Sequence, residues 1–272
     1  MVRSLWTAAT GMTAQQTNLD VIANNLSNVN TTGYKTQVNE FKTLLYQTIQ
    51  TRTTSANGEQ KPVSAQVGLG VRNASITSIF TTGNIVASTS TSAFAINGNG
   101  FFSVQGEDGN PFFTKDGNFR WTLSTNGGSM LSDTSGHPVL STTGNPIVLN
   151  QTYTLSEIDI DADGQLYYPD ANNVPQALGI QIGVFQFSNP AGLERQGDNL
   201  FAQTAASGQP INESTNNQVE KSQLLQGYLE ASNVQVADEM VNMIVTQRAY
   251  ELNSKAITAS DEMLQQANNL RR

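Results

Sequence analysis

Apolar residues recur at intervals of seven near both ends of this chain. The two series are Leu5, Met12, Leu19 and Leu26 near the start, and Val236, Met243, Tyr250, Ile257 and Leu264 near the end. A seven-residue apolar period is typical of helices that supercoil, because it keeps one stripe of side chains facing a partner helix. Ile22 and Met240 widen the two stripes. The pattern predicts two terminal helical segments, 1–33 and 232–272, paired as a coiled-coil-like domain.

Candidate capping residues mark the ends of these helices. Ser4 fits an N-cap, and Gly33 fits the left-handed residue that often ends a helix. Ser232 and Gln235 fit a capping box at the start of the second helix. Gly11 and several asparagines are poor helix formers, so the first helix is marginal alone. We expect it to be disordered in the monomer and ordered by packing.

The middle of the chain has a different pattern, in which short alternating runs are separated by turn signals. Pairs such as Asp108-Gly109 and Asp116-Gly117 separate the runs across residues 73–206. This spacing predicts an antiparallel β domain, either a barrel or a sandwich. The polar segments 34–72 and 207–231 are expected to be extended β arms that connect it to the helices. The predicted fold class is α+β.

Composition favours a subunit that packs against copies of itself. Only 13% of the 272 residues are charged, and the formal net charge is −8. A mostly neutral surface opposes self-association only weakly, although a neutral-surfaced secreted β protein would have a similar composition. Residues 73–226 contain thirteen acidic and four basic side chains, which argues against a nucleic-acid partner.

Several kinds of site and segment are excluded by what the sequence lacks. The chain has no cysteine, so disulfides, thiolate metal sites and cysteine nucleophiles are excluded. No apolar run approaches the ~20 residues that a membrane-spanning helix needs, so we expect no direct membrane insertion. The N-terminus also lacks the apolar core of a cleaved signal peptide. If the protein leaves the cytoplasm, we expect another export route.

Two features resemble chemical sites. One acidic run has the ligand spacing of an EF-hand loop; its members are Asp159, Asp161, Asp163, Gly164 and Asp170. The residues after Gly164 are strand-like, so a hairpin turn is favoured over a calcium site. His137 is the only histidine, and a turn residue is favoured over a catalytic or metal-binding role. We predict no catalytic residue, no cofactor, no bound metal and no enzyme activity.

Arg248 and Glu251 are charged residues on an otherwise mostly neutral C-terminal helix, and they flank Tyr250. Their i,i+3 spacing has two interpretations. They form a solvated pair within one helix, worth a few tenths of a kcal/mol (~0.3), or they bridge neighbouring subunits in an assembly.

Several longer motifs resemble the bacterial flagellar axial family, which comprises the rod and hook proteins. Residues 24–35 (NNLSNVNTTGYK) are similar to its N-terminal rod signature. Residues 98–102 (GNGFF) and 113–119 (FTKDGNF) resemble its β-domain motif. Residues 226–234 (QGYLEASNV) and 243–251 (MIVTQRAYE) resemble its C-terminal motif. The likeness runs the whole length of the chain.

Within this family, residues 4–12 and the arm that reaches residue 72 most resemble the distal rod members. The resemblance implies a non-enzymatic subunit that is exported unfolded through the flagellar type III apparatus and polymerises helically across the periplasm. It implies that the terminal helices line an export channel and that the β domain forms the outer wall. The implied partners are other copies of the chain, proximal rod and hook proteins at the ends, and surrounding ring proteins.

Three alternatives stay open at this point. The nearest is a hook or proximal rod subunit of the same family. The second is a secreted β-rich adhesin or enzyme that binds calcium at Asp159 to Asp170. The third is a monomeric β-domain binding module, whose termini would resist proteases in dilute solution.

Overall fold

The computed structural model describes residues 2–50, 65–124, 127–150, 153–170, 174–216 and 218–270. The chain divides into two compact units, each assembled from segments far apart in the sequence. The helical unit comprises Met1–Ser27, Gln37–Ser78 and Gln235–Arg272. The β unit comprises Asn28–Thr36 and Ile79–Val234. Two helices and many antiparallel strands make the fold α+β, as the sequence predicts.

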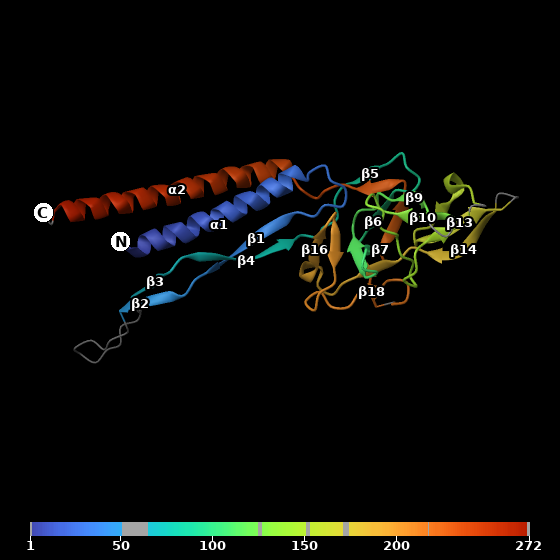
Figure 1. The fold of residues 1–272 in the computed structure, drawn as a ribbon, viewed down its shortest axis with the longest axis horizontal. Helices are drawn as coiled ribbons and strands as arrows, with labels where there is room; N and C mark the ends of the chain where they lie inside the picture. The colour runs from blue at the N-terminus through green and yellow to red at the C-terminus, as the bar shows by residue number, and fades with distance from the viewer. Residues whose placement is uncertain are drawn as a thin grey trace. The chain divides into compact units, whose positions relative to one another are not determined.

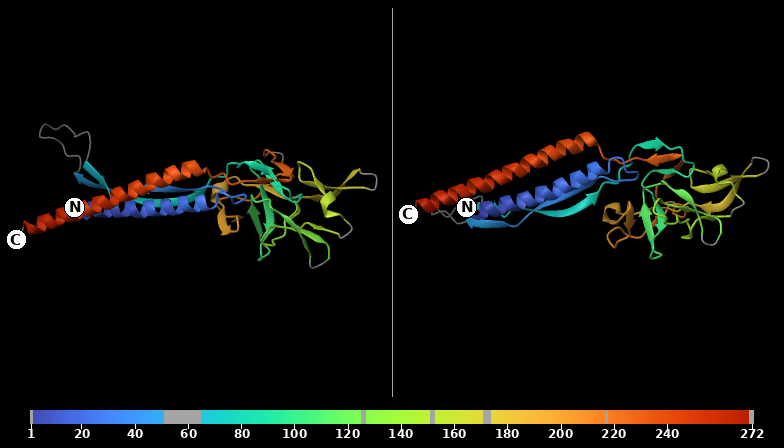
Figure 2. Two further views of the ribbon diagram at one scale, coloured as in Figure 1. Left: turned by 90° about the horizontal axis from the view of Figure 1, so that it is seen from above. Right: turned by 45° about the horizontal axis from the view of Figure 1, so that its top comes forward.

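Two antiparallel helices lie side by side in the helical unit (Figure 1; Figure 2). Helix α1 spans Val2–Ser27 and helix α2 spans Val236–Asn269. Their ends differ from the capping predictions. Helix α1 already includes Ser4 and ends before Gly33, although Gly33 does adopt a left-handed conformation. The N-cap of α2 is Gln235, whose side chain makes no capping hydrogen bond, so the predicted capping box is wrong.

The helical unit also contains two pairs of antiparallel strands. They are β1 (Gln37–Thr43) with β4 (Val71–Ser78), and β2 (Tyr46–Gln50) with β3 (Ala65–Gly68). The Asn25 side chain donates to the Gln37 carbonyl at 2.8 Å and accepts from the Gln37 amide at 2.9 Å. The Val71 amide lies 3.4 Å from Thr10 Oγ1, to which it donates. Helix α1 therefore contacts α2 on one side and the β1–β4 ribbon on another (Figure 1).

A six-stranded antiparallel sheet dominates the β unit, in the order β16-β17-β8-β7-β15-β18. Its strands are β7 (Phe101–Gln105), β8 (Pro111–Thr114), β15 (Val184–Gln186), β16 (Glu194–Gly197), β17 (Leu200–Ala202) and β18 (Ile211–Asn212). Within the described residues, β16 and β18 are its two open edges. The barrel alternative predicted from the turn spacing is therefore wrong, because the sheet does not close on itself.

Smaller antiparallel sheets complete the β unit. One three-stranded sheet contains β9 (Arg120–Leu123), β10 (Ser129–Ser132) and β11 (Val148–Leu149), and another contains β12 (Asp159–Ile160), β13 (Gln165–Pro169) and β14 (Pro175–Gln181). Two-stranded pairs join β6 (Phe94–Asn97) to β19 (Gln223–Gln226) and β5 (Ile85–Ala87) to β20 (Tyr228–Glu230). Short 3-10 helices occupy Leu155–Glu157 and Pro190–Gly192.

The β unit has a well-developed hydrophobic core. One cluster includes Phe94, Ile96, Phe102, Phe119, Leu131 and Leu166, each at most 1% exposed. A second, aromatic cluster consists of Phe101, Phe113, Phe187 and Phe201. Its rings meet edge to face, with Phe113 and Phe187 centroids 4.7 Å apart. Edge-to-face contacts of this kind stabilise a core beyond the burial of area.

Within the described part of the chain, no helix combines the length and the hydropathy that a membrane span requires.

Candidate assembly surfaces and buried junction

Helix α2 exposes an unusual number of large apolar side chains. Most of its residues are exposed, and Glu239, Thr246 and Ser260 are the fully buried ones among those described. The exposed apolar residues are Val236, Met240, Val241, Ile244, Val245, Tyr250, Leu252 and Met263. Val241 lies three and four residues before Ile244 and Val245, so these side chains are neighbours on the helix surface. Monomeric soluble proteins rarely leave a large contiguous apolar patch uncovered. This surface, called the α2 outer surface below, is therefore a candidate contact for another chain.

The residues predicted to pair the helices fall into two groups. Ile22 is buried, and the half-buried residues are Leu5, Met12, Leu19, Leu26, Met243, Ile257 and Leu264. In contrast, Val236, Met240 and Tyr250 are 41%, 52% and 43% exposed. The second group belongs to the α2 outer surface as much as to the contact with α1.

Polar side chains meet directly between the two helices, which the apolar pattern did not predict. Ser4 Oγ lies 3.2 Å from Ser260 Oγ, and Asn18 Nδ2 donates to Thr246 Oγ1 at 2.9 Å. Burial raises the pKa of Glu239 above its usual range, while a hydrogen bond from the Asn25 side chain opposes the shift. A seven-residue spacing of polar positions in α2 was the available signal for these contacts.

Arg248 and Glu251 form an ion pair within α2. Arg248 Nη1 lies 2.9 Å from Glu251 Oε2, and the two side chains are 74% and 51% exposed. Glu251 also lines a groove beside Leu19 and Tyr250, together with Gln15, Gln16 and Gln247. A solvated pair of this kind contributes little to stability. Because both side chains are mostly exposed, both charges are accessible to a second chain.

The ribbons of the helical unit expose apolar side chains as well. Leu45 is 82% exposed, and Phe41, Tyr46, Ile49, Val67 and Leu69 are also exposed. These residues lie on or beside β1, β2 and β3. They make the ribbons a second candidate contact surface.

A buried ion pair joins the two chain segments of the β unit, close to the end of each segment. Lys35 Nζ lies 2.6 Å from Glu230 Oε1, and both side chains are 0% exposed. Lys35 Nζ also donates to the Thr81 carbonyl at 2.7 Å. The Gly83 amide donates to Glu230 Oε1 at 2.8 Å. The pair thus links residues 28–36, which follow α1, to β20, which precedes α2.

Further hydrogen bonds strengthen this junction. Asn233 Oδ1 accepts from the Thr36 amide at 2.8 Å and from Thr36 Oγ1 at 2.7 Å. Arg195 Nη2 donates to the Lys35 carbonyl at 2.8 Å, and the guanidinium stacks over the rings of Tyr34 and Phe201. The two segments that lead to the terminal helices are therefore held together by polar contacts inside the β unit.

Lys115 is a second fully buried lysine, and its burial gives a testable pH dependence. Its Nζ donates to the Gly98 carbonyl at 2.8 Å and lies over the Phe101 ring. Desolvation is the main reason that the pKa of Lys115 falls from 10.5 to about 8; the negative charge of Glu230 raises this pKa and the positive charge of Lys35 lowers it. Below pH ~8 the lysine is charged in both native and unfolded chains, and the cost of burying the charge is constant.

As the pH rises from about 8 toward 10.5, the native lysine loses its proton while the unfolded one keeps it. We therefore expect the free energy of unfolding to rise over this range by about 3 kcal/mol relative to Lys115→Met. Urea unfolding of the native protein and of Lys115→Met at about pH 7.5, 8.5 and 9.5 checks this dependence of stability on pH. Parallel pH profiles would contradict it.

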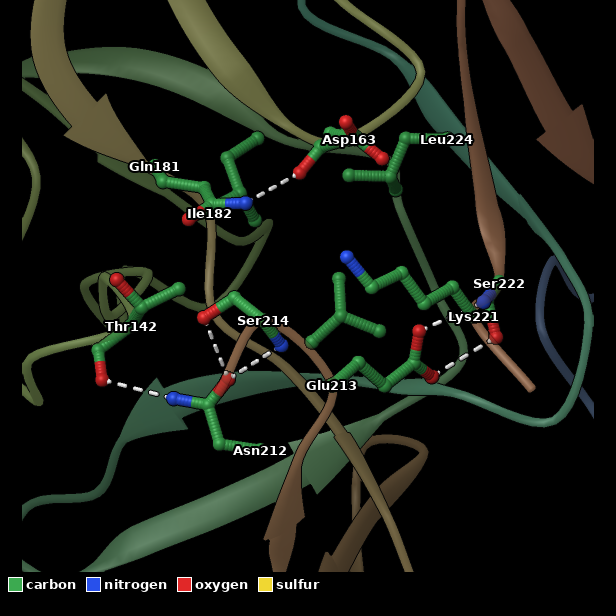
Figure 3. A pocket seen from close by; sticks show the side chains of 11 residues that line it. Thr142, Asp163, Gln181, Ile182, Asn212, Glu213, Ser214, Lys221, Ser222 and Leu224 are labelled. Atoms are coloured by element: carbon green, nitrogen blue, oxygen red, sulfur yellow. Dashed lines mark hydrogen bonds between the residues drawn. The ribbon is translucent and has the colours of Figure 1, made fainter. Parts of the chain in front are cut away.

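A small pocket in the β unit contains Glu213 and Lys221 but shows no catalytic arrangement (Figure 3). Glu213 accepts from the Ser222 amide at 2.7 Å, from Ser222 Oγ at 2.9 Å and from Gln186 Nε2 at 2.8 Å. Both carboxylate oxygens are occupied by these donors, all from buried residues. The carboxylate therefore holds the 213–222 loop against β15.

The acidic run and His137, the two sequence features that resemble chemical sites, both lie in turns. The acidic run forms the hairpin between β12 and β13, where Gly164 has a φ of 81° and its amide donates to the Asp161 carbonyl at 2.8 Å. Strands rather than helices therefore flank it. His137 Nδ1 lies 3.1 Å from Asp133 Oδ2 in a tight turn. Across the described residues, no three His, Cys, Asp or Glu side chains gather as metal ligands.

Three protein-family models match the chain, and all describe flagellar proteins. The model for a flagella basal body rod protein matches residues 5–35. The D1 domain model of the flagellar hook protein FlgE/F/G matches residues 95–168, and the C-terminal model of the flagellar basal body rod FlgEFG protein matches residues 225–270. The matched segments include α1, the β unit's core and α2.

Several full-length relatives share one name. The chain is 44% identical to the flagellar basal-body rod protein FlgG of Borreliella burgdorferi, and the match covers 100% of both chains. It is 39% identical to the protein of that name in Agrobacterium fabrum, over 96% of this chain and 97% of the relative. It is 36% identical to the Bacillus subtilis protein, over 100% of both. The chain therefore belongs to the flagellar basal-body rod protein family and is a structural protein of the distal rod, not an enzyme.

Proposed function

We propose that this protein polymerises helically into a stiff tube, the distal rod, that transmits torque and encloses the export channel. The α2 outer surface is the observation that carries the proposal. Its residues are apolar and exposed in a single chain, as with Val241 at 59% and Val245 at 61%. Burying them against neighbouring copies would remove apolar area from water and drive association.

Each predicted segment has a role in this assembly. Residues 1–33 and 232–272 form the inner tube around the channel. Residues 34–72 and 207–231 act as connector arms, and residues 73–206 form the outer wall. Residues 51–62, which we expect to wedge between adjacent subunits and stiffen the rod, lie outside the described residues.

The helix residues divide the work of pairing and assembly. We assign Leu5, Met12, Leu19, Ile22, Leu26, Met243, Ile257 and Leu264 to a coiled-coil-like contact between α1 and α2. We assign Val236, Met240 and Tyr250 to contacts between subunits, because each is more than 40% exposed. Arg248 and Glu251 extend their pairing to charges on a neighbouring subunit.

The remaining partners follow from the place of a rod in the flagellum. The chain is exported through the flagellar type III apparatus and assembles across the periplasm. Proximal rod and hook proteins adjoin the polymer at its ends, and ring proteins surround it. The family membership of the whole chain supports this placement.

The double substitution Val241→Glu and Val245→Glu tests the assembly surface. Both positions are exposed in one chain, and glutamate is a good helix former, so the fold of the monomer should persist. Charges on a surface that must be desolvated oppose association. Cells that carry this variant as their only copy should not swim, and their isolated basal bodies should lack the distal rod in electron micrographs.

The matched control adds the same two charges at exposed polar positions of α2, as Asn242→Glu and Thr258→Glu. It should assemble and support swimming. Normal rods from the Val241/Val245 variant would overturn the assignment of this surface, and loss of rods in both variants would show that added charge alone is responsible.

A further inference from the structure

Four contacts between α1 and α2 repeat every seven residues, and three of them join polar side chains. The α1 members are Ser4, Gly11, Asn18 and Asn25, and the α2 members, met in that order, are Ser260, Asn253, Thr246 and Glu239. Each step of seven residues along α1 is matched by seven residues back along α2, so all four contacts belong to one antiparallel register. We call these four contacts the polar ladder.

Every rung of the polar ladder has its own geometry. Ser260 Oγ donates to the Ala256 carbonyl at 2.8 Å, so it is the acceptor for Ser4 at 3.2 Å. A side chain at Gly11 would bring its Cβ within 2.8 Å of Asn253 Nδ2, so the absence of a side chain makes room for the asparagine. Asn18 donates to Thr246, and Asn25 is hydrogen-bonded to Glu239.

Four members of the polar ladder are buried, whereas Gly11, Asn18 and Asn253 are half-buried and Ser4 is exposed. Thr246, Ser260 and Asn25 are 3%, 4% and 1% exposed, and Glu239 is 8% exposed. Sliding one helix by three or four residues would break the hydrogen bonds that cross between the helices, although Ser260 would keep its bond to Ala256 and Asn25 its bonds to Gln37. For Thr246 and Glu239 this would leave a buried polar group without its partner, which costs more than the bond contributes. Sliding one helix by seven residues would place Asn253 opposite Ser4 or Asn18 instead of the space at Gly11.

We propose that the polar ladder sets the register of the α1–α2 pair. The half-buried apolar residues hold the helices together, whereas the ladder allows a single alignment, as buried polar positions do in other helix pairs at some cost in stability. The alignment in turn places the α2 outer surface at one height relative to the β1–β4 ribbon, because Asn25 is also bound to Gln37.

Engineered cysteine pairs can report the register directly, since the chain contains no cysteine of its own. Ser4→Cys with Ser260→Cys reports the observed register. Ser4→Cys with Asn253→Cys reports a slip of seven residues, because a disulfide requires the two Cα atoms to lie within about 7 Å. After mild oxidation of the full-length protein in isolated basal bodies, an intramolecular disulfide is distinguished on a denaturing gel from one between chains.

The test compares the native ladder with Asn18→Ala, Thr246→Ala and Glu239→Ala combined, which leaves Asn25 and its bonds to Gln37 in place. Alanine favours the helix, so helical content should persist and is checked by circular dichroism. We expect only the in-register disulfide with the native ladder. We expect comparable yields of both disulfides in the triple variant, a rise of about tenfold or more in the slipped form.

Two controls make the result decisive. Thr13→Ala, Thr258→Ala and Asn242→Ala combined change three exposed polar residues on the same helices and should leave the register unchanged. The exchange Asn18→Thr with Thr246→Asn keeps one amide and one hydroxyl at the same rung and should also remain in register. A triple variant that cross-links in register alone would overturn the proposal, as would disulfides formed between chains with the native ladder.

Discussion

Replacing Lys35 by methionine is expected to lower the free energy of unfolding of the β unit by about 3–5 kcal/mol. Methionine nearly fills the volume but removes the cation that lies 2.6 Å from Glu230 Oε1. The carboxylate would then be buried without its counter-charge, and its Oε2 already has no hydrogen-bond partner. The Thr81 carbonyl keeps a bond from Asn233 Nδ2 at 3.2 Å, so the loss concerns mainly the uncompensated charge.

Urea unfolding of the full chain with Trp6→Phe as the common background, followed by the fluorescence of Trp121, measures this loss. The control is Lys35→Met combined with Glu230→Gln, which removes both charges and retains an acceptor for the Gly83 amide. We expect the double variant to lose only about 1–2 kcal/mol, because neither charge of the pair remains to be desolvated. Equal losses in the single and double variants would show that the burial of an unpaired charge is not the cause.

The second large effect is expected at Gly117, within the 113–119 motif. An alanine there would place its Cβ 1.7 Å from the Phe94 carbonyl oxygen and 2.7 Å from the Phe94 carbonyl carbon. These are backbone atoms of a core strand, so no flexible side chain can move aside. The Gly117 carbonyl also accepts from the Phe94 amide at 2.9 Å, which ties the two segments together. We expect Gly117→Ala to cost about 3 kcal/mol or more.

Gly109→Ala is the matched control for this substitution. Gly109 has a φ of 77° and open space around its missing Cβ, so alanine there pays only the cost of a left-handed conformation, about 1 kcal/mol. Thermal unfolding of both variants should therefore show a much larger fall in Tm for Gly117→Ala. Equal falls in Tm would mean that backbone conformation, and not the close approach of Phe94, is the reason that position 117 requires glycine.

Much of the architecture was predictable because its signals are local. Turn pairs such as Asp108-Gly109 mark places where the chain must reverse, and the alternating runs between them became strands. Arg248 and Glu251, three residues apart on one helix, do form an ion pair. In each case the partners are neighbours in the sequence, so backbone geometry alone brings them together.

The capping residues were less predictable, since several side chains near a helix end can satisfy the free backbone groups. The helix includes Ser4 because it starts two residues earlier, and α2 starts after Gln235 without a side-chain cap. Contacts across the chain were not predictable at all. Lys35 and Glu230 are 195 residues apart, and nothing local to either residue identifies the other.

By itself, then, the sequence determined the helical ends, the β-rich middle, the α+β class and a seven-residue repeat in each terminal helix. It contained two repeats in α2, one apolar through Met243 and Ile257 and one polar through Thr246 and Ser260. Periodicity specifies the spacing of a stripe but not the partner that it faces. Only the tertiary structure decided that the polar stripe meets α1 while much apolar area stays exposed. The reason is that burial depends on the side chains that α1 presents across the contact, and these come from the other end of the chain.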